Sequence, residues 1–361
     1  MIAQDDLDAD LAAGVAQGII TDAQAAALRA LAAEREKARA AALGHEERFR
    51  FMRGFNDFFF ASGVLLFGAG AAFFAGAAPI ANLVAAATFW ALAELLVARL
   101  RLVLPGLLLV VFLAYFVSLA VPVESWVGGL AHASFAPRVS FLDALGGNPA
   151  IGSTRGLLIA IAGLAFFARF RFPFALLPVA GGLVIAVMAL ARFYSGFIDP
   201  HAMLLLCGII VFAAAMAFDA TDRERATRRA DCAFWLHLLA APLIVHSLVW
   251  LLAGNAGNAF EAMTGRLAAT IIAIVVVLAL VAVVIDRRAL LVSTLTYLGI
   301  VIAYALKTAS IDQDKVFFAT LLVLGAMVLI IGVAWLPLRR GLMMLVPSRV
   351  ALRLPPVVSA A

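Results

Sequence analysis

Polar and apolar positions divide the chain into one polar N-terminal stretch and a long series of apolar runs. The polar stretch ends at Asp57, and a charge-free apolar run of 19 residues begins at Phe58. Because an α-helix rises about 1.5 Å per residue, such a run nearly crosses the roughly 30 Å hydrocarbon core of a bilayer. The run therefore predicts a first transmembrane helix, and its orientation sets that of every later span.

Ten apolar runs follow the polar stretch. They occupy residues 57–77, 79–98, 102–122, 152–168, 173–191, 200–218, 233–253, 267–285, 289–306 and 316–336. We therefore predict an all-α protein, a polytopic membrane helix bundle with ten transmembrane helices. The predicted domains are a cytosolic helical hairpin (1–56), a transmembrane domain (57–336) and a cytosolic tail (337–361).

The fourth run is the shortest, with only 13 charge-free residues between Arg155 and Arg169. The distribution of basic residues decides whether it crosses. With ten spans and a cytoplasmic N-terminus, the inner segments hold 21 Lys and Arg and the outer segments hold 6, which accounts for all 27. Without the fourth crossing the split becomes 13 to 14 and the positive-inside bias disappears. The fourth run is therefore predicted to cross, with Arg155 snorkelling toward the outer interface.

Residues 1–56 predict a short helix followed by a longer one, from Asp22 to about Leu43. Leu7, Leu11 and Val15 recur every fourth residue and define one face of a helix that ends at Gly18. Thr21 and Gln24 then fit a capping box at the start of a second helix. The hairpin has little apolar surface, so we expect it to pack against the membrane domain, a protein partner or its own copy.

Composition excludes a soluble globule, because 65% of the residues are apolar and only 14% are charged. The net charge of +5 is explained by basic residues at the ends of apolar runs, which favours a lipid bilayer and not nucleic acid as the partner.

The N-terminus lacks the basic region and cleavage site of a signal peptide. Cys207 and Cys232 give no disulfide framework and read as free thiols. The preference for Arg over Lys and the abundant Ala are typical of a GC-rich bacterial genome, and we predict a protein of the bacterial inner membrane.

Ionisable groups at membrane depth are costly and are therefore candidate functional residues. His246 lies near the middle of the seventh run and His237 nearer its inner end, and nine residues of helix place them on opposite faces. His246 fits either a neutral histidine bonded to a neighbouring helix or a residue in a central cavity. Pro242 between them could open that cavity by kinking the helix.

Charged residues near the inner interface form a second group of candidates. Asp57 begins the first run and Glu94 lies one turn inside the second, at a depth similar to that of Arg99 and Arg101. These residues can form structural ion pairs as the first helices assemble. The alternative is an inner gate whose ion pair breaks during transport.

The fifth run carries Pro178, Gly181 and Gly182 near its middle. A helix broken there would free backbone groups to coordinate a substrate, as in transporters. Pro and Gly are also ordinary kink and close-packing residues in membranes. Gly68, Ala72 and Gly76 recur every fourth residue in the first run and form a small-residue face, which fits either packing within the chain or a dimer.

The connector from Asp219 to Asp231 is dense in charges of both signs. It fits a solvated segment that sets topology, or a docking site for an acidic partner or anionic headgroups.

Catalytic signatures are absent from the sequence. It has no H-E-x-x-H, G-x-S-x-G, P-loop or C-x-x-C motif in a fitting context, and no pair of deep carboxylates. We therefore expect no enzymatic activity, no cofactor and no metal.

Four segments resemble an uncharacterised bacterial family of integral membrane proteins, of the domain-of-unknown-function kind. They are GIITDAQAAAL (18–28), RGFND (53–57), FWALAELLVARLRLVLP (89–105) and WLPLRRGLMMLVPSRVALRLPP (335–356). The resemblance implies a cytosolic helical hairpin followed by many membrane helices, and a bacterial origin. It implies no activity and no site.

Two functions remain open from the sequence. The first is a transporter or permease-like protein for a weakly charged or apolar solute, with both termini cytoplasmic. The second is a non-transporting scaffold or sensor that recruits partners, or a second copy, through residues 1–50 and its loops. A water-accessible centre near Gly182 or His246 would distinguish the first from the second.

Overall fold

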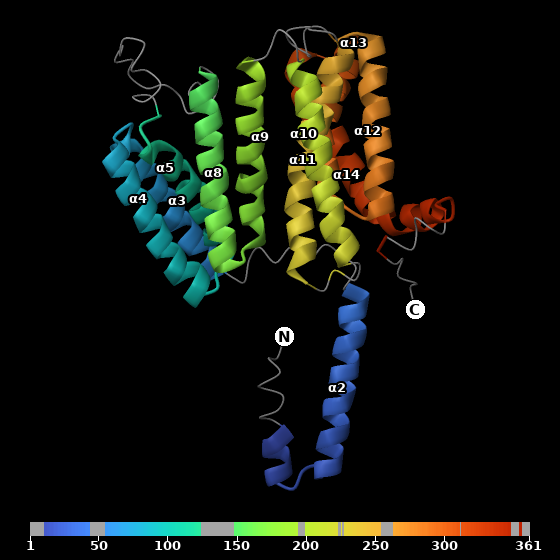
Figure 1. Cartoon of the computed structure of the whole chain (residues 1–361). Helices are drawn as coiled ribbons and strands as arrows, with labels where there is room; N and C mark the ends of the chain where they lie inside the picture. The colour runs from blue at the N-terminus through green and yellow to red at the C-terminus, as the bar shows by residue number, and fades with distance from the viewer. Residues whose placement is uncertain are drawn as a thin grey trace.

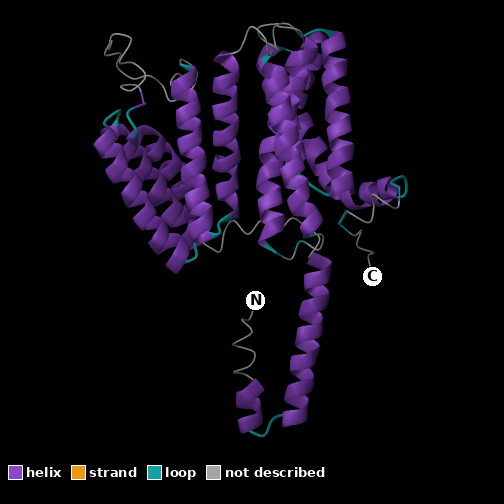
Figure 2. Ribbon diagram, viewed as in Figure 1, coloured by secondary structure: helices purple, strands orange, loops and turns teal. Residues whose placement is uncertain are grey.

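A computed structural model describes residues 11–43, 55–123, 148–193, 199–222, 225, 227–253, 263–310, 312–347 and 354–355. Throughout these ranges the regular structure is helical, and no strand occurs (Figure 2). Helices stand side by side in a bundle, and one helix, α2 (Asp22–Leu43), projects away from it (Figure 1). The predicted all-α membrane helix bundle is confirmed.

The N-terminal hairpin forms as its local signals predict. Residues 11–16 are helical, and Gly18 follows with a φ of +69°, the left-handed conformation that ends a helix. The Thr21 amide donates to Gln24 Oε1 (2.9 Å), and the Gln24 amide donates to Thr21 Oγ1 (3.3 Å), which completes the capping box. Leu7 lies outside the described residues, and Leu28 on α2 is exposed.

The bundle consists of two groups of five apolar helices, here called the first half and the second half. The first half contains α3 (Phe55–Ala75), α4 (Pro79–Ala93) with the π-helix η1 (Glu94–Arg99), α5 (Leu104–Ala120), α8 (Pro149–Phe170), and α9 (Leu176–Phe193) preceded by the 3-10 turn η3 (Pro173–Ala175). The second half contains α10 (Pro200–Thr221), α11 (Arg228–Ala253), α12 (Gly265–Ile285), α13 (Ala289–Thr308) and α14 (Gln313–Met343). Figure 1 shows the halves side by side, with α9 facing α10 and α11.

Each of the ten predicted runs corresponds to one of these helices. Within the described ranges, nine helices are long and apolar enough to cross a membrane, and α5 is a shorter apolar helix of 17 residues. The fourth run forms the 22-residue α8, which is long enough to cross a membrane, as predicted. When η1 is counted with α4, the shortest of the ten helices is α5, which is formed by the third run. Arg155 of α8 is buried and does not snorkel to an exposed position. The bundle end at which α3 begins is called the hairpin end, and the opposite end the far end.

The last helix extends beyond its predicted limit. The sequence places the end of the span at residue 336, but α14 continues to Met343 with Pro337 inside it. Its last turns lie across the hairpin end of the second half (Figure 1). A proline inside a helix removes one backbone hydrogen bond and favours such a change of direction.

The core of the first half is aromatic. Phe89, Phe116 and Phe166 are fully buried, and the rings of Phe89 and Phe116 lie 5.2 Å apart. A Cβ on Gly68 would clash with the ring of Phe112, so Gly68 of α3 packs against α5 within the chain.

Of the two interpretations of the fifth run, close packing agrees with the structure and a broken helix does not. α9 runs without interruption from Leu176, and Pro178 lies in its first turn, where proline costs no hydrogen bond. A Cβ on Gly182 would meet the Gly156 carbonyl oxygen at 2.5 Å, whereas one on Gly181 would meet nothing within 4 Å. Gly182 therefore allows close packing of α9 against α8, whereas Gly181 faces open space.

Candidate functional site

At the hairpin end of the second half, charged side chains converge in a buried cluster. Asp219, in the last turn of α10, accepts hydrogen bonds from Arg287 Nε (3.0 Å) and from the Nη2 of the same guanidinium. His237 Nε2 of α11 lies 3.0 Å from Asp219 Oδ2. All three side chains are buried, and Phe212 packs against the imidazole with ring centroids 5.2 Å apart.

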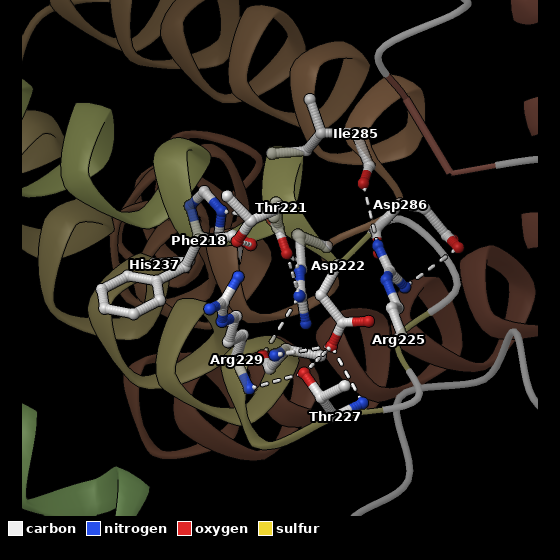
Figure 3. Close-up of polar contacts among 12 residues, drawn as sticks. Phe218, Thr221, Asp222, Arg225, Thr227, Arg229, His237, Ile285 and Asp286 are labelled. Carbon is white, nitrogen blue, oxygen red and sulfur yellow. Dashed lines mark hydrogen bonds and ion pairs between the residues drawn. The ribbon is translucent and has the colours of Figure 1, made fainter.

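A second carboxylate, Asp286, collects three donors beside the first group. It occupies the left-handed conformation between α12 and α13, with a φ of +59°. It accepts from Arg225 Nη1 (3.1 Å), Arg339 Nη1 (3.1 Å) and Trp335 Nε1 (2.8 Å). Arg225 also donates to the backbone carbonyls of Ile285 (3.0 Å) and Asp286 (2.8 Å), as Figure 3 shows.

Asp222 organises the connector between α10 and α11. Its Oδ2 accepts from the Thr227 hydroxyl (2.6 Å), the Thr227 amide (3.0 Å) and the Ala230 amide (3.3 Å), so it caps the start of α11 (Figure 3). Arg287 Nη2 donates to the Ala230 carbonyl at 3.1 Å. The interpretation of this connector as a solvated segment is therefore wrong for Asp219, Asp222 and Arg225.

We call this set the arginine–aspartate network; it comprises Asp219, Asp222, Arg225, His237, Asp286, Arg287, Trp335 and Arg339. Its members come from α10, α11, α14 and two connectors, so it joins the hairpin ends of the second half. Buried charges persist only when they are paired and hydrogen-bonded, as these are. Arg339 Nη2 additionally donates to the Pro355 carbonyl (2.7 Å), and Leu354 is buried beside it.

A second polar cluster lies nearer the far end of the same half. His246 Nδ1 of α11 is 2.6 Å from the hydroxyl of Tyr297 on α13. His201, at the start of α10, stacks on Trp250 with ring centroids 5.2 Å apart and planes 12° apart. The His201 and His246 rings are 6.4 Å apart. We call His201, His246, Trp250 and Tyr297 the histidine–aromatic cluster.

The two histidines of α11 have different environments. His237 is fully buried among the charges of the network, whereas His246 and Pro242 are exposed one turn apart on the same strip of α11. Helix α11 passes through Pro242 and continues to Ala253. His246 is therefore hydrogen-bonded to a neighbouring helix and is also exposed, and its place in a central cavity stays a prediction.

The predicted charge group of the first half is rearranged. Glu94 pairs with Arg169 on α8, with Nη2 and Oε2 2.7 Å apart, and not with an arginine of the first three helices. Arg99 and Arg101 are exposed, and Asp57 is buried at the start of α3. Glu94 is the first residue of the π-helix η1, which continues α4.

The described residues offer no group of three or more His, Cys, Asp or Glu side chains that could hold a metal ion. Cys207 and Cys232 are buried free thiols. A scan of protein-family models, a search of curated proteins and a search of solved structures find no match to this chain.

Sequence reasoning missed the arginine–aspartate network almost entirely. It placed Asp219 in a connector with a solvated interpretation, and it gave Asp286 and Arg287 no role. One signal was available. An acidic and a basic residue, Asp286 and Arg287, fill the very short connection between the eighth and ninth runs, where little chain separates them from the helices.

Proposed function

We propose that this protein is a transporter or permease-like membrane protein for a weakly charged or apolar solute. The proposal takes the hairpin end as the cytoplasmic side of a bacterial inner membrane, because the segments at this end carry the excess of arginine.

The observation that carries the proposal is the exposed, hydrogen-bonded His246. Ionisable side chains within membrane spans almost always face a bundle interior or a water-filled space, because exposure to lipid is costly. His246 lies seven residues before the end of α11, and its partner Tyr297 lies well inside α13. An exposed imidazole at that depth is best explained by a solute path that borders α10, α11 and α13.

The arginine–aspartate network supplies the second element that a transporter needs. It closes the hairpin end of the same half with paired, buried charges, whereas the histidine–aromatic cluster lies toward the opposite end. A path open at one end and sealed at the other is the arrangement that alternating access requires. The network therefore acts as the closed inner gate of the proposed path.

Cysteine accessibility tests the proposal. In a Cys207→Ala/Cys232→Ala background, His246→Cys is treated with a membrane-impermeant maleimide in intact cells. Leu206→Cys is the matched control, because Leu206 is exposed six residues into α10, at a comparable distance from the far end. Val245→Cys is the buried control and Thr308→Cys the exposed positive control.

We expect position 246 to react at least tenfold faster than positions 206 and 245, because only position 246 meets water at depth. Failure of position 246 to react from either side, with position 308 reacting normally, contradicts a solute path. The scaffold function then takes its place. One observation favours that function, namely the exposure of Leu28 and Leu31 on the projecting α2.

A further inference from the structure

We propose that the histidine–aromatic cluster binds a planar, uncharged ring compound that carries a carbonyl oxygen or ring nitrogen as a hydrogen-bond acceptor. This inference deepens the proposed function, because it names the chemical class of the solute. It rests on four side chains from three helices, α10, α11 and α13.

The hydrogen bond between His246 and Tyr297 fixes what the imidazole can offer. The distance of 2.6 Å between Nδ1 and the hydroxyl oxygen is a short, strong contact. We assign the hydroxyl as the donor, because a phenol donates better than it accepts, and the proton of the neutral imidazole then lies on Nε2. In the described part of the chain Nε2 makes no hydrogen bond, and the residue is exposed. His246 therefore presents an N–H donor to a ligand.

The rings around this donor provide a surface for a flat molecule. His201 and Trp250 are stacked nearly parallel, and the His246 ring lies 6.0 Å from Trp250 and 6.4 Å from Tyr297. Aromatic side chains at these separations favour offset-stacked or edge-on contact with a further ring. A donor beside stacked rings is complementary to a planar ligand with an acceptor at its edge.

The charge in the cluster disfavours an anionic ligand. None of its four side chains carries a guanidinium, an ammonium or a carboxylate. The adjacent carboxylate, Asp199, lies 3.8 Å from His201 Nδ1 and already caps α10 by accepting from the amides of His201 (2.8 Å) and Ala202 (2.9 Å). An anionic ligand would meet no fixed positive charge here, and its desolvation would be uncompensated.

Two sources can supply such a ring. One is the bilayer, which dissolves quinones on isoprenoid tails and delivers them laterally into the proposed solute path. The other is the aqueous phase at the far end, which carries small aromatic amides. The compounds from both sources carry the ring and the acceptor, so the same side chains would bind them. The experiment below distinguishes the two sources.

Equilibrium binding to the full chain in phosphatidylcholine nanodiscs tests the inference. The probe is radiolabelled 2-methyl-1,4-naphthoquinone, which has the ring and carbonyls without a tail, and empty nanodiscs give the background. A prenylated naphthoquinone supplied in the lipid and nicotinamide supplied in the buffer serve as competitors. Competition by the first alone indicates the bilayer source, and competition by the second alone indicates the aqueous source.

Variants separate the ring surface from the donor. His246→Phe keeps a ring but removes the donor, and one lost hydrogen bond of about 0.5–1.5 kcal/mol corresponds to a roughly 2- to 12-fold weaker affinity. Tyr297→Phe removes only the hydroxyl that sets the tautomer, and we expect a smaller loss of affinity. Trp250→Leu removes the stacking surface, whereas Trp235→Leu on the same helix, which packs against Phe174, leaves affinity unchanged.

Saturable binding that weakens in the His246, Tyr297 and Trp250 variants, with unchanged elution of each variant on size exclusion, supports the inference. Absence of saturable binding above empty nanodiscs overturns it, as does binding that none of these variants affects. Should His246→Phe not fold, Tyr297→Phe alone decides. If position 246 reacts with maleimide but the probe does not bind, the ligand class is wrong and the solute path stands. If the probe binds but position 246 does not react with maleimide, the ligand class stands and the solute path is wrong.

Discussion

Different interactions stabilise the two halves of the bundle. The first half packs an aromatic core, with Phe89, Phe116 and Phe166 fully buried, and brings α8 and α9 into backbone contact at Gly156 and Gly182. The second half fixes its hairpin end with the arginine–aspartate network. The stability of a close-packed core depends on the volume of every side chain in it. The stability of a charge network depends on each charge keeping its partner.

This difference has a mechanical consequence. Close-packed glycine and aromatic contacts fit together in a single low-energy arrangement. The first half is therefore suited to move as a rigid body. A network of directional bonds gains little net free energy over apolar packing, because desolvation of the charges offsets their attraction. Such a network can exchange one set of partners for another at modest cost, which suits the half that carries the proposed path.

The largest expected effect comes from removing one charge of the network. Arg287→Ala leaves Asp219 buried without its bidentate partner, and we expect a loss of about 3–5 kcal/mol in the free energy of unfolding. Arg288→Ala is the matched control, since Arg288 is exposed and only covers the Trp335 ring at 5.2 Å, a contact of about 0.5–1 kcal/mol. Unfolding in mixed micelles with increasing SDS measures both. Equal losses for the two arginines would remove the distinction between buried and exposed charge in this half.

An intermediate effect is expected from adding volume to the first half. Gly182→Ala places a methyl group against the Gly156 carbonyl, and overpacking of this kind costs roughly 1–3 kcal/mol. Gly181→Ala meets open space, and the higher helix propensity of alanine makes it neutral or stabilising by up to about 1 kcal/mol. Thermal unfolding of the two variants, followed by size exclusion, compares them. A destabilised Gly181→Ala beside an intact Gly182→Ala would reverse the assignment of the packed face.

The smallest effect is expected at the ion pair of the first half. Glu94 and Arg169 are half-exposed, so solvent screens their attraction, and Glu94→Gln should cost about 0–1 kcal/mol. The same SDS titration, run at low and at high salt, checks this value and its small salt dependence. A loss comparable to that of Arg287→Ala would mean that the first half also depends on charge at its hairpin end.

The sequence predicts most of the fold because membrane helices are specified locally. Ten apolar runs give the ten helices, and the short-range pair Thr21 and Gln24 gives the capping box that the structure contains. The sequence left a break in the fifth helix open because Pro178 lies near the middle of the apolar run. In the structure η3 takes up the first residues of that run and leaves the proline in the first helical turn.

Candidate-site residues depend on contacts between distant positions, which periodicity does not encode. Glu94 meets Arg169 only because α8 packs beside the end of η1. Asp219 and Arg287 are 68 residues apart, and no local pattern pairs them. His246 was identifiable because it is a lone imidazole in an apolar run, but Tyr297 and His201, which complete its surroundings, were not.

The contact between Arg339 and the Pro355 carbonyl also bears on how the chain is made. During synthesis, Asp219 reaches the membrane before Arg287, and Arg287 before Arg339 and Pro355. Asp219 is therefore synthesised before its partner Arg287, and Asp286, which follows its partner Arg225, is synthesised before Trp335 and Arg339. Assembly of the second half is consequently a late event that is completed near the carboxyl-terminal end of the chain, whereas the first half can settle while translation continues.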